Sequence, residues 1–381
     1  MEIYLDNAAT SHPKPDSVIQ AVTRALTSHN ANPGRSGHRR ALQAGRALMD
    51  CRSALAMCLG APDPLNISFA HNCTDALNLA IKGTLSTGDH VITTALEHNS
   101  VLRPLMTLKA RGVIDVTLIE PDGDGFIQPQ TIKDGIRKNT KLVAVTQASN
   151  VLGTVQPVAA IGEVTAAHGI SFLIDGAQAL GLFPVNVQSL ACDLYAFPGH
   201  KGLLGPQGTG GLYIREGLPV TPIREGGTGS SSDSMIQPEE RPDCYESGTV
   251  NFHSIAGLHA GVEYIRDNAL TLRAHERALT EQLMKGLTAF SQAKVYASSD
   301  ARNRVGVVSF NLMDYASGAV ADALNRRGFA VRGGLHCAPG AHTWLGTLTR
   351  GAVRVSVGYK NTSQEIEAFL RAVQEITRGG L

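Results

Sequence analysis

Short apolar runs alternate with amphipathic segments through residues 67–214. The runs are rich in Val and Ile and predict strands, because branched side chains pack well on a pleated surface. The segments between them have apolar residues at helical spacing and predict helices. This alternation indicates a mostly parallel sheet covered by helices on both faces, so the predicted class is α/β. The expected strands are Ile67–Ala70, Val91–Thr94, Val113–Ile119, Leu142–Thr146, Ser171–Ile174, Leu194–Phe197 and Gly211–Ile214, and the clearest helices are Ala76–Leu85, Val101–Ala110 and Ile161–Ala167.

The pattern changes after the last of these strands. Residues 226–251 hold glycines, serines, prolines and many polar residues, and they predict a long loop. A long helical stretch and a second, shorter α/β pattern follow. We therefore predict a large domain over residues 1–255, which includes an N-terminal segment, and a linking helix with a smaller C-terminal α/β domain over residues 256–381. The expected elements of the second part are helices Ser254–Phe290, Ser317–Arg327 and Ser363–Thr377 and strands Val305–Asn311, Ala330–Arg332 and Ala352–Val357.

Composition excludes several classes of protein. The 381 residues include 34 basic and 33 acidic side chains with no long run of one sign, which argues against a nucleic-acid-binding protein. No stretch approaches the roughly 18–20 consecutive apolar residues that span a membrane, and the acidic start does not resemble a signal peptide. The six cysteines lack zinc-site spacing. We therefore expect a cytoplasmic protein with reduced thiols, no metal site, and neither nucleic acid nor membrane as a partner.

Candidate chemistry begins where the expected strand Leu194–Phe197 ends. Pro198 and Gly199 break that strand, so His200 and Lys201 lie at its carboxyl end, where ligands bind in open α/β sheets. A lone lysine in a turn is usually just solvated. However, three further polar segments end at the same edge of the predicted sheet, and together they indicate a binding site.

The first of these segments places Asp175 directly after the expected strand Ser171–Ile174. A carboxylate there suits a basic ring nitrogen of a cofactor, or it caps the next helix. In the second segment, Asn72, Cys73 and Thr74 join a strand to a helix whose free N–H groups suit a phosphate; the alternative is a simple helix cap.

The third segment places His98 after the strand Val91–Thr94. An imidazole at that position can stack on a flat cofactor and exchange protons near neutral pH, or it is an ordinary loop histidine.

Taken together, these segments resemble the class V aminotransferase family of fold-type I enzymes, which use pyridoxal 5'-phosphate (PLP), and within it the cysteine desulfurases and selenocysteine lyases. The resemblance runs from Leu5–Thr10 to Arg354–Ser356. Its most specific part is Asp175–Gln178 followed by Gly199–Lys201. It implies a large PLP-binding domain in which Lys201 binds the cofactor covalently and later moves the substrate Cα proton.

The resemblance also implies roles for further residues. Asp175 pairs with the ring nitrogen, Gln178 meets the ring hydroxyl, and His98 stacks on the ring and takes part in catalysis. Thr249 matches a residue that reaches the phosphate of a neighbouring subunit, which implies a homodimer. Cys73, Thr74 and His200 would hold the phosphate. Pro198 and Cys73 stand where many relatives carry hydroxyl residues, so the phosphate would be anchored more weakly or by other donors. The implied cofactor-binding set is Cys73, Thr74, His98, Asn150, Asp175, Gln178, His200, Lys201 and Thr249.

Cys337 distinguishes a sulfur enzyme from a transaminase. It lies in a Gly- and Pro-rich loop beside His336, and a loop thiol near positive charge can act as a nucleophile. By resemblance, Cys337 takes the sulfur or selenium and leaves alanine. If Cys337 is instead a buried, inert thiol, the chain is another class V enzyme, such as an aminotransferase, an epimerase or a β-lyase. A sulfur-carrier or regulatory protein without activity is a third reading.

Two arginines complete the predicted site. Arg354 lies in the alternating strand Ala352–Val357, where it is either a surface arginine or a bidentate partner of a carboxylate. By resemblance, Arg354 binds the substrate α-carboxylate, Asn150 contacts the substrate, and Arg332 orients the Cys337 loop or the substrate. The expected substrate is L-cysteine or L-selenocysteine, and a protein that accepts the sulfur is expected as a further partner.

Overall fold

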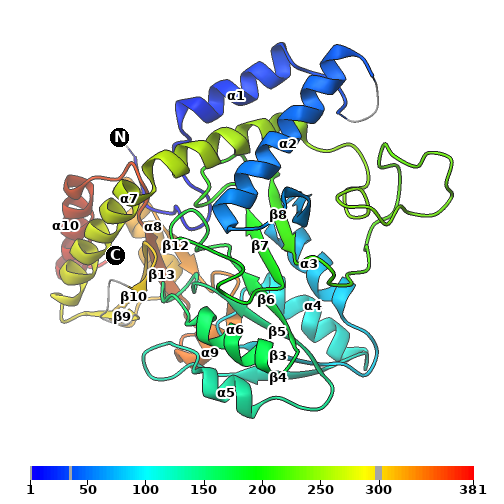
Figure 1. Cartoon of the computed structure of the whole chain (residues 1–381). Helices are drawn as coiled ribbons and strands as arrows, with labels where there is room; N and C mark the ends of the chain where they lie inside the picture. Colours follow the sequence, from blue (N-terminus) through cyan, green and yellow to red (C-terminus); the bar gives the residue numbers. More distant parts are fainter. Residues whose placement is uncertain (1, 34–36, 297–302) are drawn as a thin grey trace.

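The computed structural model in Figure 1 describes residues 2–33, 37–296 and 303–381. Its centre is a seven-stranded sheet whose strands were all predicted from the sequence. The sheet has the order β2 (Ile67–Ala70), β8 (Gly210–Ile214), β7 (Leu194–Pro198), β6 (Ser171–Asp175), β5 (Thr140–Thr146), β3 (His90–Thr94) and β4 (Asp115–Ile119).

The strands β7, β6, β5, β3 and β4 run parallel, whereas β8 is antiparallel to both of its neighbours. The segment between β7 and β8 is short, and a parallel crossover needs about a dozen residues or more, so the chain can only turn back. The predicted mostly parallel sheet is therefore confirmed. Because parallel strands end at one edge, the turns after β3, β5, β6 and β7 meet there.

Helices cover both faces of this sheet and bury its strands (Figure 1). One face packs against α3 (Cys73–Thr84) and α4 (Asn99–Ala110). The other packs against α2 (Arg39–Leu59), α6 (Val158–Ala167) and the first part of α7 (Phe252–Thr288). The strands are apolar on both sides because both of their faces are covered.

The C-terminal part is a second layered unit. Its antiparallel sheet has the order β12, β13, β10, β9 and packs against the end of α7 and two further helices. The bounds are β9 (Ala293–Tyr296), β10 (Val307–Leu312), β12 (Arg332–Gly334), β13 (Ala352–Ser356), α8 (Ser317–Arg326) and α10 (Ser363–Gly379). The remaining elements are α1 (Asp16–Thr27), α5 (Pro129–Asp134), α9 (Pro339–Trp344) and a 3₁₀ turn (Pro64–Asn66).

The N-terminal segment packs on the C-terminal part rather than on the central sheet. Strand β1 (Ile3–Tyr4) pairs in parallel with β11 (Phe329–Ala330), and Leu5 lies in the apolar cluster formed by the C-terminal sheet and its helices. Helix α7 is a single helix of 37 residues, and the predicted division between residues 255 and 256 falls in its first turn. That division stays a prediction.

The long segment between β8 and α7 contains neither helix nor strand, as predicted for residues 226–251. In Figure 1 it extends from the right side of the molecule. Within the described part of the chain, no helix combines the length and the apolar character that crossing a bilayer requires.

Candidate active site

A cavity of about 170 Å³ lies at the carboxyl edge of the central sheet. Its wall comes from the turns that follow β2, β3, β5, β6 and β7, which are far apart in the sequence but lie at the same edge of the sheet. This arrangement brings together eight of the nine predicted cofactor residues, namely Cys73, Thr74, His98, Asn150, Asp175, Gln178, His200 and Lys201. Thr249 is the exception.

Lys201 enters the cavity wall from the turn after β7. Burial lowers the pKa of its ammonium group, although the nearby Cys73 and Asp175 oppose this shift. A lowered pKa increases the fraction of neutral amine near pH 7, and the neutral amine is the form that attacks a carbonyl carbon. The side chain is therefore suited to bind a carbonyl-bearing cofactor covalently.

Asp175 is the last residue of β6 and is almost completely buried. Its Oδ1 accepts a hydrogen bond from the Ala177 N–H at 2.9 Å and lies 3.5 Å from the Cys73 thiol. Burial raises the pKa of Asp175, and the Ala177 N–H and the charge on Lys201 only partly offset this effect. A buried carboxyl group with so few donors suits a protonated ring nitrogen as its partner.

The start of α3 offers backbone donors for an anion. Asn72 is the helix cap, since its side chain accepts from the Asp75 N–H at 2.9 Å, so the cap reading of Asn72 is confirmed. The Cys73 thiol is directed toward Asp175. A phosphate at this position would therefore meet the N–H groups of Cys73 and Thr74 rather than a Cys73 side chain.

His200 completes this side of the cavity. Its Nδ1 is buried and has no hydrogen-bond partner among the residues that the structure describes. Burial, together with the charges of Lys201 and Lys14, lowers its pKa to about 4, so the ring is neutral at pH 7. A buried polar atom without a partner requires an explanation, and a bound ligand supplies one.

His98 is also neutral. Its Nδ1 accepts from the Ser100 N–H at 3.1 Å and lies 2.9 Å from the Ser100 hydroxyl, which in turn is 2.7 Å from Thr74 Oγ1. Burial, together with the charge on Lys201 and nearby arginines, lowers its pKa to about 4. A flat neutral ring held by two contacts suits stacking on a planar cofactor better than it suits carrying a proton at neutral pH.

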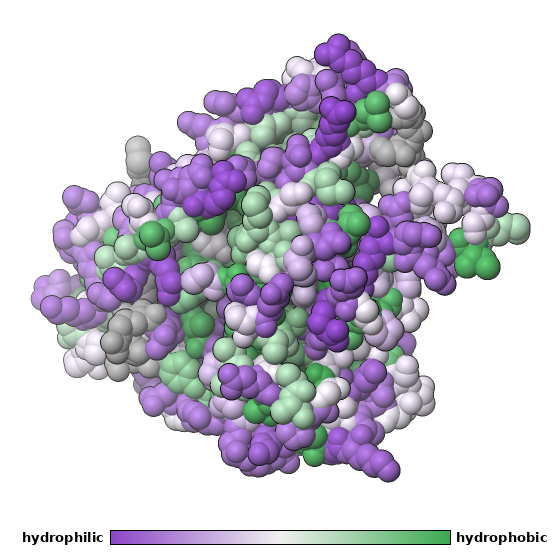
Figure 2. Space-filling model, in the orientation of Figure 1, coloured by the Kyte–Doolittle hydropathy of each residue, from purple (hydrophilic) through white to green (hydrophobic). Residues whose placement is uncertain are grey.

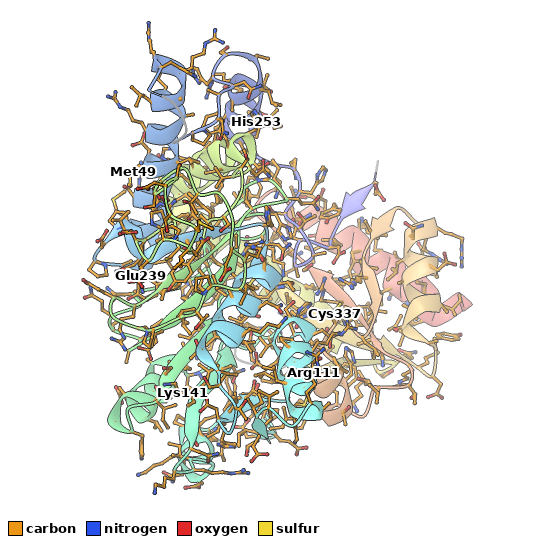
Figure 3. The ribbon with its side chains drawn as sticks, turned by 90° about the vertical axis from the view of Figure 1, so that its right-hand side faces the viewer. Met49, Arg111, Lys141, Glu239, His253 and Cys337 are labelled. Atoms are coloured by element: carbon orange, nitrogen blue, oxygen red, sulfur yellow. The ribbon has the colours of Figure 1, made fainter. Side chains whose placement is uncertain are left out.

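The Cys337 loop, residues 335–338 between β12 and α9, is held against this cavity by hydrogen bonds to its backbone carbonyls. The Cys337 carbonyl accepts from the Asn99 N–H at 2.6 Å, and Asn150 Nδ2 donates to the His336 carbonyl at 2.7 Å. Both His336 and Cys337 adopt left-handed backbone angles, φ 50° and 57°. Such angles cost about 1–2 kcal/mol per non-glycine residue, so these contacts hold the loop in an unfavourable conformation. Figure 3 shows Cys337 between the central and C-terminal parts.

The positive charge beside Cys337 comes from Arg332 and not from His336. Arg332 Nη2 lies 3.9 Å from the Cys337 sulfur. His336 is buried and stacks on His342, and burial lowers the pKa of His336 to about 3, so it carries no charge at neutral pH. The sequence places His336 next to the thiol but does not reveal that burial keeps it neutral.

Arg354 is almost completely buried in β13, so the reading as a surface arginine is wrong. Its Nη2 donates to Asp6 Oδ1 at 2.7 Å and its Nη1 to the Asn150 carbonyl at 3.3 Å. Its Nε is buried and has no partner among the described residues. The guanidinium is thus fixed in place with its Nε–H still available to a further acceptor, which suits a carboxylate.

Thr249 lies in the long loop and lines a different hollow, together with His71, Arg224 and Ser247. Within one chain it does not reach the cavity that holds Lys201.

Comparison with known proteins decides the family. The model of the aminotransferase class-V family matches residues 3–369. The chain belongs to this family. It is 36% identical to a probable cysteine desulfurase of Methanothermobacter thermautotrophicus, covering 99% of this chain and 95% of that one. It is 32% identical to a cysteine desulfurase of Shigella flexneri, covering 98% and 93%. The apo structure of a cysteine desulfurase from Thermococcus onnurineus NA1 superposes with a TM-score of 0.93 at 34% identity, covering 99% and 95%.

The predicted resemblance to the cysteine desulfurase group is therefore confirmed, and the chain is an enzyme of this PLP-dependent class V family. Three residues around the class V site were not predicted from the sequence, namely Asp6, Glu97 and Ser100. Asp6 lies in the segment Leu5–Thr10 that carried part of the resemblance, and the other two flank His98, so their positions were the available signal. Their contacts join segments that are distant in the chain, and local patterns do not predict such contacts.

Proposed function

We propose that the chain is a cysteine desulfurase that uses PLP and transfers the sulfur of L-cysteine to Cys337, releasing alanine. The observation that carries this proposal is the cavity that unites Lys201, Asp175 and His98, with the Cys337 loop bonded to its wall through Asn150. The names of the relatives at 32–36% identity support the same activity.

The residues of the cavity fit PLP by their unused polar atoms. Lys201 would hold it covalently, Asp175 would pair with the ring nitrogen, and the neutral His98 would lie against the ring. Gln178 Nε2 already donates to the Ala8 carbonyl at 3.0 Å, so its Oε1 is left to accept from the ring hydroxyl. His200 Nδ1 would gain a partner near the phosphate. When bound, PLP supplies an electron sink for the amino-acid carbon.

The remaining residues bind and orient the amino acid. Arg354 would grip the α-carboxylate through its unpaired Nε, while Asp6 and the Asn150 carbonyl keep the guanidinium plane fixed. Lys201 would move the Cα proton, because its lowered pKa favours the neutral amine that accepts one.

The sulfur chemistry belongs to Cys337. Its sulfur attacks the substrate sulfur, so an S–S bond forms on Cys337 while the Cβ–S bond of the substrate breaks. The electron pair of the broken bond stays with the substrate carbon, which takes up a proton and becomes the methyl group of alanine. Arg332, 3.9 Å from the Cys337 sulfur, places a positive charge beside the attacking sulfur.

The same proposal includes a homodimer, a location in the cytoplasm and a protein that accepts the sulfur from Cys337. The position of Thr249 supports the dimer, because this residue does not reach the cavity of its own chain. The loop that carries Thr249 also exposes Met235 and Ile236. Figure 2 shows hydrophobic surface on the right, where this loop extends from the molecule in Figure 1. Exposed apolar side chains on an extended loop suit contact with a second subunit.

Replacing Cys337 by Ala tests the proposal. Wild type with PLP should release sulfide and alanine in equal amounts from L-cysteine in the presence of a thiol reductant. Cys337→Ala should keep the absorbance of lysine-bound PLP but lose sulfide release, whereas Cys58→Ala, at a half-buried cysteine outside the cavity, should keep both. Undiminished sulfide release by Cys337→Ala would show that the thiol is incidental and that another class V reaction operates.

A further inference from the structure

The segment Asp6–Lys14, which leads from β1 to α1, joins two parts of the site; we call it the N-terminal strap. Its first end is bonded to β13, the strand of Arg354. Besides the ion pair of Asp6 with Arg354, the Ala8 N–H donates to Ser356 Oγ at 2.9 Å and Asn7 Nδ2 to the Ser356 carbonyl at 3.1 Å. This end of the strap is therefore fixed to the group that would grip the substrate carboxylate.

The second end of the strap converges on the carbonyl oxygen of His200. Four donors lie within hydrogen-bond distance of this oxygen: Lys14 Nζ at 2.8 Å, the Ser11 N–H and Ser11 Oγ at 3.1 Å, and Thr10 Oγ1 at 3.2 Å. The oxygen belongs to the peptide bond that joins His200 to Lys201. A carbonyl oxygen has only two lone pairs, so this one is fully committed to the strap.

Burial of the Lys14 ammonium group at this position is energetically unfavourable by itself. Lys14 is partly buried, and burial lowers its pKa to about 8, so its amine is still mostly charged at neutral pH. Burying an ammonium group is unfavourable unless its hydrogen bonds are made, and Lys14 makes them to Ser11 Oγ at 2.7 Å and to the His200 carbonyl. The middle of the strap also accepts from Gln178, the residue assigned to the ring hydroxyl.

We propose that Asp6 and Lys14 are positioning residues, and that the N-terminal strap sets the separation between Arg354 and Lys201. The proposal rests on the proposed function, in which Arg354 holds the carboxylate of an amino acid and Lys201 carries the cofactor that receives its amine. A ligand held at two points binds well only when the two points have the right spacing. When contacts of the strap are lost, the separation between Arg354 and Lys201 is no longer fixed. Binding of a ligand that needs both groups then weakens, although both residues are still present.

The test compares five variants by kcat/KM for L-cysteine. Lys14→Met and Asp6→Asn should each lower it roughly tenfold, since small misplacements at a reacting centre have effects of this size or larger. Lys14→Arg keeps the charge and should restore most of the loss. Lys109→Met is the matched control, because Lys109 Nζ also donates to a backbone carbonyl, that of Val116 at 3.2 Å, but away from the cavity.

The double variant of Asp6 and Lys14 separates a shared role from two independent ones. If the strap acts as one unit, releasing its second end adds little. The double variant should then lose about as much kcat/KM as the more damaging of the two single variants. Independent roles would multiply to a loss of roughly a hundredfold, because effects at uncoupled sites add in free energy. Multiplying losses would overturn the proposal.

A binding measurement gives a readout without turnover. L-Alanine, followed by the absorbance of bound PLP, uses both anchors, whereas propionate, followed by its competition with L-alanine, lacks the amine and uses only Arg354. Lys14→Met should weaken L-alanine binding roughly tenfold and leave propionate unchanged. Equal weakening of both ligands, or of neither, would overturn the proposal. A wild type that binds PLP and L-alanine but releases no sulfide would refute the desulfurase activity alone, since these binding constants would still measure the strap.

Discussion

The buried side chain of Glu97 predicts a pH dependence of folding stability, and the contacts around this side chain determine its magnitude. Glu97 lies between β3 and His98, has no exposed surface, and accepts through Oε1 from Thr94 Oγ1 at 2.7 Å and from the Thr146 N–H at 2.9 Å. Its Oε2 is buried with no partner in the described residues. Burial therefore raises its pKa from 4.5 to about 8, although both hydrogen bonds oppose the shift.

The sign of the effect on stability follows from proton counting. Between pH 4.5 and about 8 the folded chain keeps a proton on Glu97 that the unfolded chain has lost, so folding becomes less favourable as pH rises. The slope is about 1.4 kcal/mol per pH unit, which amounts to about 2 kcal/mol between pH 6.5 and 8. Glu97→Gln keeps the shape and carries no proton to lose. Its stability advantage over wild type should therefore grow by about 2 kcal/mol across this interval and stop growing above it.

Urea unfolding followed by circular dichroism at pH 6.5, 7.25, 8 and 8.75 measures this difference. Comparing the variant with wild type at each pH cancels the other titrating groups, including His98 and His200, whose lowered pKa values affect stability below this interval. Glu239→Gln is the control, because Glu239 is exposed, as Figure 3 also shows. A stability difference that stays constant from pH 6.5 to 8 would refute the reasoning, since Glu97 would then be ionised in the folded chain.

Two further substitutions test the substrate site. Arg354→Lys should raise the KM for L-cysteine about tenfold in steady-state kinetics, because a lysine cannot hold Asp6, the Asn150 carbonyl and a carboxylate in one plane; an unchanged KM would exclude Arg354 from carboxylate binding. Gly340→Ala would place a Cβ 2.5 Å from the Ala95 carbonyl oxygen, so the Cys337 loop must shift. We expect slower sulfide release with L-alanine binding retained, and equal loss of both would contradict this local effect.

Local patterns were enough to predict the central sheet and the turns that carry the chemistry. Val- and Ile-rich runs are buried on both faces. Strand β7 ends one residue later than predicted, because Pro198 still pairs with Gly210 as its last residue, and His200 and Lys201 follow the strand as expected. The strand that begins at Asp115 was expected two residues earlier, because Val113 and Ile114 are apolar but lie before the sheet. Helix α2 was not predicted, although its C-terminal half packs on the sheet.

Contacts between segments that are distant in the chain could not be predicted from the sequence. Asp6 and Arg354 are 348 residues apart, and no local pattern pairs them. The same holds for the Cys337 carbonyl, which meets the Asn99 N–H across the two parts of the chain. Burial also changes the charge that the sequence suggests. His336 is next to Cys337 in the sequence and could carry a positive charge there, but burial keeps it neutral in the fold.

The pairing of β1 with β11 also has a consequence for biosynthesis. Residues 3–8 leave the ribosome more than 300 residues before their partners Phe329–Ala330, Arg354 and Ser356. At roughly 5–20 residues per second, the N-terminal strand waits on the order of 15 to 65 seconds before it can pair. The cavity around Lys201 can form earlier from the central sheet. Nascent chains therefore pass through a stage that has the cavity around Lys201 but still lacks Arg354, the proposed anchor for the substrate carboxylate.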